Sequence, residues 1–359
     1  MSVLSENRGG IASSQPPEIV SAPRYQPGVH RLAVLLAVWA FLVVSVGGLV
    51  KSREGGLSIA AGFMVVWHLE WLWPFSPNYN GANLAAEYGH RALVGIMSGI
   101  TFLVAIAVFW SDRRRSVRAL ATALIGVLFL QAFLGYLTVT YFAHAPTSIP
   151  HAFLGQAFLC MAVAMAAVTS QRWLSDAPAL PCEASPSLCR LGVYAVAAVG
   201  VQLLLGAALR HDDQGLALRT GRSHVFVWHL LAHIAGALAV VYFVFRLLLR
   251  VFRNHRQQPE ILRPARIVMM LLGVQFLLGP GAAVLKVTTL EDSYMPPLHR
   301  VIAATLHLAA GALILALCVL LSLRAHRFTA PVLSSTPSDP GRDRDRDGAV
   351  QSGLARVTA

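Results

Sequence analysis

The sequence predicts an all-α membrane protein with eight transmembrane helices, arranged as two parallel four-helix repeats. Of its 359 residues, 56% are hydrophobic and only 13% are charged, whereas a soluble domain has about 25% charged residues. Apolar runs of about 20 residues, enough to cross a bilayer, recur along the chain. The net charge of +12 does not indicate nucleic-acid binding, because the basic residues gather in short gaps between these runs.

The predicted helices follow the apolar runs. They fall at residues 31–50, 88–110, 118–141, 151–171, 190–209, 225–249, 266–285 and 303–323. We expect five segments: an N-terminal tail (1–30), a first four-helix half (31–172), a linker (173–189), a second four-helix half (190–326) and a C-terminal tail (327–359). Alternating Arg and Asp residues predict that the C-terminal tail is disordered.

Arginine clusters give the predicted orientation. They lie between the second and third runs and between the sixth and seventh, whereas the loop between the third and fourth contains no Lys or Arg. The clusters consist of Arg113, Arg114, Arg115, Arg118, Arg250, Arg253, Arg256, Arg263 and Arg266. Cytoplasmic loops are enriched in such residues. We therefore expect a multi-pass protein of the bacterial inner membrane, with both termini cytoplasmic and no cleaved signal peptide.

An internal repeat supports the two halves. Gln131-Ala-Phe-Leu-Gly135 in the third run recurs as Gln202-Leu-Leu-Leu-Gly206 in the fifth and Gln275-Phe-Leu-Leu-Gly279 in the seventh. Helices 1–4 therefore correspond to helices 5–8. Because four is an even number, both halves enter the membrane in the same sense, as a parallel repeat.

Each even-numbered helix carries a histidine near its predicted outer end, followed within about one turn by a glycine. The histidines are His90, His151, His233 and His307, and the glycines are Gly95, Gly155, Gly236 and Gly311. A lone histidine in an apolar helix is more often a hydrogen-bonded packing residue than a ligand. Four at equivalent positions favour two sites in which facing imidazoles bind haem iron, with the glycines leaving room for the macrocycle.

Two ligand assignments have alternatives in the sequence. His229 lies one turn before His233, and His299 lies two turns before His307. The glycine spacing and the expected depth favour His233 and His307, whereas the repeat offset favours His299. The remaining histidines near loops are expected to be solvated: His30, His144, His211, His224, His255 and His326.

The strongest local motif is Glu87-Tyr-Gly-His90-Arg91 at the start of the second helix. Glu87 precedes His90 by one helical turn on the same face, where a carboxylate can transfer protons or bind a cationic intermediate. The alternative is a carboxylate that only stabilises a helix N-terminus. Arg91 is a candidate partner for a haem propionate or a lipid phosphate.

These residues resemble the haem A synthases of cytochrome oxidase assembly over roughly residues 30–326. The resemblance lies in Gly47-Gly48…Gly56-Leu57-Ser58, Glu87-x-x-His90-Arg91, the Gln-x-x-x-Gly motifs, His151-Ala-Phe-Leu-Gly-Gln156, His233 and His307-Leu-Ala-Ala-Gly311. It implies oxidation of a methyl group of haem O to the formyl group of haem A by successive hydroxylations. It also implies that His90 and His151 hold the substrate haem, that Glu87 is the essential carboxylate, and that His233 and His307 ligate a haem b for electron transfer.

The sequence departs from the family pattern in three places. Ile234 stands where the family usually has Arg after the histidine, Ile59-Ala60-Ala61-Gly62 stands where many relatives have Asp-Trp-Pro, and the outer-loop cysteine pairs of some members are absent. The resemblance implies haem O as substrate, delivered by a haem O synthase. It leaves the electron donor and a homo-oligomer open.

Two other functions compete with this one. A non-catalytic b-type cytochrome, passing electrons between membrane partners, would need the four histidines but not Glu87. A transporter would usually show discontinuous helices with polar residues at the bilayer midplane. Here the polar residues lie near the predicted outer surface, so the transporter ranks last.

Overall fold

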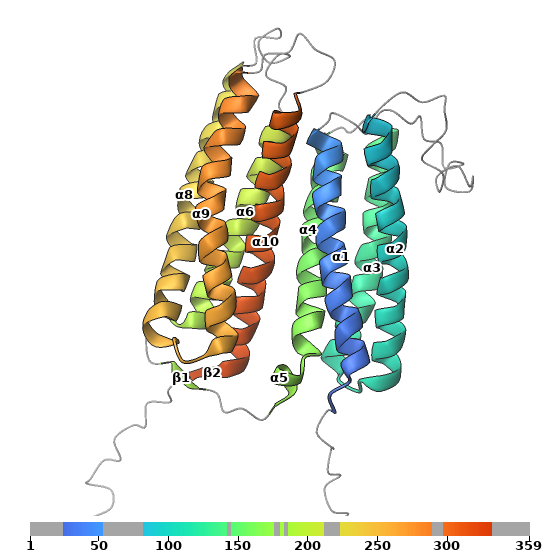
Figure 1. Cartoon of the computed structure of the whole chain (residues 1–359), viewed down its shortest axis with the longest axis vertical. Helices are drawn as coiled ribbons and strands as arrows, with labels where there is room; N and C mark the ends of the chain where they lie inside the picture. Colours follow the sequence, from blue (N-terminus) through green and yellow to red (C-terminus); the bar gives the residue numbers. More distant parts are fainter. Residues whose placement is uncertain are drawn as a thin grey trace, which may run out of the picture.

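The computed structural model describes residues 24–52, 82–141, 145–175, 180–182, 186–211, 223–288 and 297–331, and the statements below concern these residues. Eight long helices dominate the described chain (Figure 1): α1 (Pro27–Ser52), α2 (Ala82–Ser111), α3 (Arg115–Thr140), α4 (Ala145–Val168), α6 (Leu188–His211), α8 (Ser223–Asn254), α9 (Pro259–Thr288) and α10 (Leu298–Phe328). Each is long and apolar enough to cross a membrane. The predicted all-α fold with eight spans is confirmed, and the chain is a multi-pass membrane protein.

Every helix is longer than its apolar run. The arginines expected in the loops illustrate the difference, because α3 already begins at Arg115 and α9 at Pro259, so that Arg118, Arg263 and Arg266 lie within helices. Long basic side chains can extend from a helix end towards water while the backbone keeps its helical hydrogen bonds. The apolar pattern therefore marks the membrane core of each helix rather than its ends.

The helices pack as two groups of four that stand side by side (Figure 1). We call α1–α4 the first group and α6, α8, α9 and α10 the second group. Each group has its own apolar core; Leu36, Val104, Leu124 and Phe158 belong to the first, and Leu188, Val244, Ile261 and Leu321 to the second. The division of the chain into two repeated halves remains a prediction.

Small residues lie where helices approach closely, both at the interface between the two groups and inside the second group. A Cβ at Gly48 of α1 would lie 3.0 Å from the Leu308 side chain of α10, and one at Gly192 of α6 would lie 3.0 Å from the Ser322 backbone of α10. Ala312 of α10 packs into the core of the first group. Small side chains let membrane helices approach closely, so α10 contacts both groups.

The outer surface of the bundle is apolar. The Leu277 and Phe276 side chains of α9 are 75% and 72% exposed. Apolar side chains exposed over the length of such helices are expected where lipid, and not water, surrounds the protein. In an apolar 18-residue stretch of each helix, 6% of the residues of α9 are buried, against 50% of those of α10, so α9 is peripheral and α10 central.

The predicted linker and C-terminal tail contain more structure than expected. The linker forms α5 (Gln171–Leu174) and β1 (Leu180–Cys182), and β1 pairs in parallel with β2 (Thr329–Pro331), which directly follows α10. The first residues of the predicted tail are therefore hydrogen-bonded to the linker. Residues 1–23, the long loop 53–81 and the tail 332–359 lie outside the described residues.

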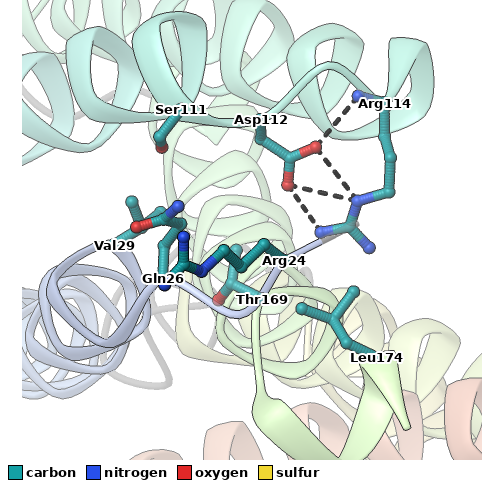
Figure 2. Close-up of a pocket in the computed structure, with 8 residues that line it drawn as sticks. All are labelled: Arg24, Gln26, Val29, Ser111, Asp112, Arg114, Thr169 and Leu174. Carbon is teal, nitrogen blue, oxygen red and sulfur yellow. Dashed lines mark hydrogen bonds and ion pairs between the residues drawn. The ribbon is translucent and has the colours of Figure 1, made fainter. Parts of the chain in front are cut away.

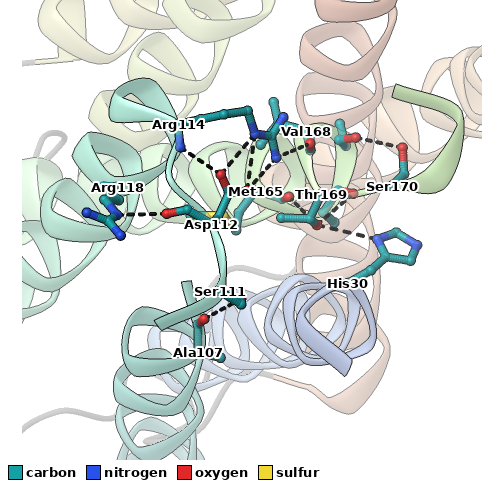
Figure 3. Close-up of polar contacts among 12 residues, drawn as sticks. His30, Ala107, Ser111, Asp112, Arg114, Arg118, Met165, Val168, Thr169 and Ser170 are labelled. Carbon is teal, nitrogen blue, oxygen red and sulfur yellow. Dashed lines mark hydrogen bonds and ion pairs between the residues drawn. The ribbon is translucent and has the colours of Figure 1, made fainter. Parts of the chain in front are cut away.

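The helix turns rich in arginine share one end of the bundle with α5, β1 and β2 (Figure 1), which we call the arginine end; the opposite end is the histidine end. In the α2–α3 turn, Arg114 pairs with Asp112 at 2.6 Å and donates to the Val168 carbonyl of α4 at 3.0 Å (Figure 3). Burial raises the pKa of Asp112, but hydrogen bonds from Arg114 outweigh it and hold the pKa below its ordinary value.

A small pocket lies beside this ion pair (Figure 2). It is lined by Arg24, Gln26, Val29, Ser111, Asp112, Arg114, Thr169 and Leu174. The pocket brings together the start of α1, the α2–α3 turn and the end of α4, so its polar contacts close the first group at the arginine end. The four candidate haem ligands lie nearer the histidine end, away from this corner.

Candidate functional site

The four predicted histidines form two pairs, one in each helix group. In the second group, the His233 and His307 rings have their centroids 6.3 Å apart, with an angle of 71° between the ring planes. In the first group, His90 and His151 lie close enough for their charges to interact. Each pair of histidines thus comes from two helices, α2 and α4 or α8 and α10, that pack mainly against the other helices of their group and not against each other.

The separation in the second group suits one metal ion between the two rings. A bond from an imidazole nitrogen to a metal is about 2 Å long, so two imidazoles on opposite sides of one ion have ring centroids roughly 6 Å apart. Among the described residues, no group of three or more His, Cys, Asp or Glu side chains could hold a metal ion. The imidazole pairs are therefore the candidate ligands, as in haem proteins with two axial histidines.

A glycine on the preceding long helix packs against each imidazole. The pairs are Gly47 with His90, Gly135 with His151, Gly206 with His233 and Gly279 with His307. A Cβ at any of these glycines would lie between 2.9 and 3.3 Å from the Cε1 atom of the ring. An alanine there would displace the imidazole, so the glycines keep the space that each ring occupies.

Glutamines contact three of the four histidines, two through the backbone carbonyl and one through the ring. The Gln131 amide donates to the His151 carbonyl at 2.9 Å, and the Gln202 amide donates to the His233 carbonyl at 3.0 Å. The Gln275 Nε2 atom lies 3.5 Å from the His307 Nε2 atom. Each Gln-x-x-x-Gly motif thus applies its glutamine and its glycine, one turn apart, to the same neighbouring histidine.

This packing corrects one expectation from the sequence. Gly155, Gly236 and Gly311, one turn after their histidines, were expected to leave room for a macrocycle. Instead, they face the glutamine side chains of the neighbouring helices; Gly155, for example, would place a Cβ 3.2 Å from Gln131 Nε2. The repeated spacing of four residues between Gln and Gly was visible in the sequence. The sequence does not show which helices these residues contact.

The structure places the alternative histidines away from the paired rings. His299, in the first turn of α10, is exposed, and His229 is half-buried. The described ring contact in the second group joins His233 to His307. Packing therefore favours His233 and His307 as the facing pair.

Two histidines expected to be solvated are enclosed instead. His255, in the turn between α8 and α9, is 4% exposed. His211, the last residue of α6, has its Nε2 atom 2.6 Å from Ser148 Oγ of α4, across the seam between the groups. Both lie beside loops, as expected. The sequence does not reveal the tertiary contacts that bury His255 and join His211 to Ser148.

Glu87 distinguishes the two sites. It lies one turn before His90 on α2 and is 4% exposed, so a buried carboxylate residue stands one helical turn from the first pair. Arg91 follows His90 and is partly buried. Only three carboxylates occur among the described residues, and Asp112 and Glu260 pair with arginines at the arginine end. The second pair therefore has no carboxylate near it in the described chain.

The unpaired polar atoms fit a missing group between the rings. Within the described residues, His90 Nδ1, His307 Nδ1 and the amide oxygens of Gln131, Gln202 and Gln275 are buried without a hydrogen-bond partner. Such atoms cost about 1–3 kcal/mol each when nothing satisfies them and call for an explanation. Paired imidazoles, glycines that admit them and unsatisfied polar atoms together fit a haem site in each group.

Comparison with known families agrees with this chemistry. The chain matches the COX15-CtaA family, described as cytochrome oxidase assembly protein, over residues 78–306, well over half of its length. The matched region contains Glu87 and the first three histidines and ends one residue before His307. A comparison with curated proteins found no match. The chain belongs to the cytochrome oxidase assembly family of haem A synthases.

Proposed function

We propose that the protein oxidises a methyl group of haem O to the formyl group of haem A, using a haem b in the second group for electron transfer. Membership of the family supports a haem A synthase role in cytochrome oxidase assembly. The observation that carries the division of labour is Glu87. A buried carboxylate stands one turn from one imidazole pair, and the other pair lacks one in the described chain.

In this proposal, the first group is the catalytic site. His90 and His151 bind the substrate iron from α2 and α4, with Gly47 and Gly135 keeping their rings in place. Glu87 accepts or donates a proton at the edge of the bound haem. A buried carboxylate one helical turn from a ligand can have this role. Arg91 binds a carboxylate of the substrate.

The second group holds a resident haem b. His233 and His307 would hold its iron, with Gln202 bonded to the His233 carbonyl and Gln275 against the His307 ring. Haem iron with two histidine ligands changes oxidation state without a change of ligands, which suits electron transfer. The protein contribution is to hold both rings and to exclude water from between them.

The same proposal covers the surroundings of the protein. The arginine end faces the cytoplasm of a bacterial inner membrane, in keeping with the positive-inside rule, and the histidine end faces outward. Haem O reaches the first group from a haem O synthase within the membrane. The electron donor is a separate partner of the protein. The exposed apolar surface of α9 is compatible with association of further copies of the chain.

The test compares haem A formation by the wild type and by Glu87→Ala and Glu87→Gln. With a supply of haem O, both variants should form haem A about 10²–10⁴ times more slowly, because general acid–base assistance has about this magnitude. Haems B, O and A are extracted and quantified by chromatography. Glu260→Gln, which removes a carboxylate at the arginine end, is the matched control and should keep wild-type activity.

The outcomes separate the enzyme from a cytochrome. Wild-type rates in both Glu87 variants would mean that Glu87 only stabilises its helix. Bound haem O without any haem A, even in the unmodified protein supplied with reductant and oxygen, would favour the non-catalytic b-type cytochrome.

A further inference from the structure

Arg210 is a cation beside the second imidazole pair that the proposed mechanism does not use. It lies four residues after Gly206, hence one turn nearer the histidine end on the same face of α6. Gly206 packs against His233, and the guanidinium is close enough to His307 for their charges to interact. Arg210 is therefore placed beside His307 and one turn from the glycine that packs against His233, on the side of the histidine end.

Within the described chain, the hydrogen bonds of Arg210 leave its charge without an anion. Its Nη2 group donates to the Gly48 carbonyl at 3.2 Å and to Ser52 Oγ at 2.7 Å, both on α1. Its Nε and Nη1 groups make no hydrogen bond within the described chain, and the carboxylates Asp112 and Glu260 pair with arginines at the opposite end. A charge inside a membrane span is costly unless an opposite charge offsets it.

We propose that Arg210 binds a propionate carboxylate of the haem held by His233 and His307. The inference rests on the proposed function, which places a haem b between these residues. A guanidinium offers two parallel N–H donors to a carboxylate, which makes arginine well suited to this ligand. Because Nη2 already bonds to α1, the same side chain also ties the bound haem to the first group.

The first group has a cation at the corresponding place. Lys51 follows Gly47 by four residues on α1, as Arg210 follows Gly206 on α6, and both glycines pack against a candidate ligand. α1 and α6 are the first helices of their groups. The shared spacing of glycine and cation is what two sites for the same type of anionic porphyrin require.

The test measures whether the protein recognises the carboxylates of the porphyrin. The full chain is produced under haem limitation, purified in detergent and titrated with haem B or with its dimethyl ester, in which both propionates are esterified. The signal is the low-spin absorption spectrum that His307→Leu abolishes. Wild-type protein should bind haem B about 10- to 100-fold more tightly than the ester, since hydrogen bonds to charged groups have about this strength.

The variants then assign this preference to Arg210. Arg210→Gln should bind haem B and the ester with similar, weak affinity, and its haem should have a lower midpoint potential, because loss of a nearby positive charge favours the ferric state. Arg210→Lys should keep most of the preference. Ser52→Ala removes a hydrogen bond between α1 and Arg210 but not the charge, so it should retain the preference.

Two results would overturn the inference. A full preference for haem B in Arg210→Gln would show that another group binds the propionates. An equal loss of preference in Ser52→Ala and Arg210→Gln would show that Arg210 only joins α1 to α6. If instead wild-type protein gave no low-spin spectrum, or His307→Leu left it unchanged, the proposed haem b site would itself be wrong, and this inference with it.

Discussion

The two helix groups use the same parts around their histidines but differ at one ligand. In the second group, Gln202 of α6 donates to the His233 carbonyl, and Gln275 of α9 lies against the His307 ring. In the first group, Gln131 contacts His151, whereas Val43 stands one turn before Gly47, where a glutamine facing His90 would be. Instead, His90 has Glu87 beside it, 4% exposed.

This difference fits the proposed division of labour. A resident cofactor stays bound through many turnovers, which a glutamine beside each of its two histidines supports. A substrate enters and its product leaves, which suits a site with one glutamine and with a buried carboxylate one turn from a ligand. Under the proposal, the resemblance of the groups concerns haem binding, and their difference concerns chemistry.

The largest effect should come from filling the space of an imidazole. In Gly206→Ala, the new Cβ would lie 3.0 Å from His233 Cε1, and such overpacking costs about 1–3 kcal/mol. We expect about a 10- to 100-fold weaker retention of haem b, measured from the low-spin spectrum, with the first site unaffected. Gly135→Ala should do the reverse.

Gly200→Ala on the same helix is the matched control, because its Cβ would meet no atom within 4 Å. Equal losses in Gly200→Ala and Gly206→Ala would show that the helix, and not the imidazole, is sensitive.

Removing one glutamine should have a smaller effect. Gln202→Leu deletes the hydrogen bond to the His233 carbonyl, whose net contribution is about 0.5–1.5 kcal/mol. Haem b should then dissociate about 2- to 10-fold faster, while haem A formation per bound haem b stays the same. Gln131→Leu should leave haem b unchanged and weaken substrate binding. Faster loss of haem b in Gln131→Leu than in Gln202→Leu would contradict the assignment of glutamines to sites.

The smallest effect concerns the arginine end, where the groups also differ. The turn of the first group carries the Asp112–Arg114 pair, while the turn of the second carries the buried His255. Because the pKa of folded Asp112 is below its ordinary value of 3.8, its stabilisation is present above that pH and is lost as the pH falls through the folded value.

Asp112→Asn should therefore lower stability by about 1 kcal/mol at pH 7, and the deficit should shrink as the pH falls below 3.8. Thermal unfolding in detergent over a series of pH values measures this. A deficit that does not change with pH would mean that the carboxylate charge is not what stabilises the turn. The haem spectra should be the same as those of the wild type.

The sequence predicted much of this molecule because its strongest signals are local. Apolar length gave the eight helices, and histidine positions along even-numbered helices gave the candidate ligands. What it missed depends on contacts between helices. The glycine of Gln131-x-x-x-Gly135 was recognised as a motif, but only packing shows that Gly135 faces His151. Likewise, the sequence alone does not choose between His299 and His307 as the candidate ligand. The structure favours His307, because Gly279 and the His233 ring both pack against it.

Arg210 was missed for the same reason. In the sequence it precedes His211 at the end of an apolar run, where a basic residue is common and indicates no particular function. Its contacts to Gly48 and Ser52, about 160 positions away along the chain, appear only when α1 and α6 are placed together.

The most direct test of the account is the haem content of two single-ligand variants. His151→Leu and His307→Leu, expressed with a supply of haem O, are purified, and their haems are extracted and quantified by chromatography. We expect His151→Leu to retain haem B with its low-spin spectrum while losing haems O and A, and His307→Leu to lose haem B. Loss of the same haems in the same proportion from both variants, or a selective loss of haem B from His151→Leu, would contradict the division into a catalytic first group and a cofactor-binding second group.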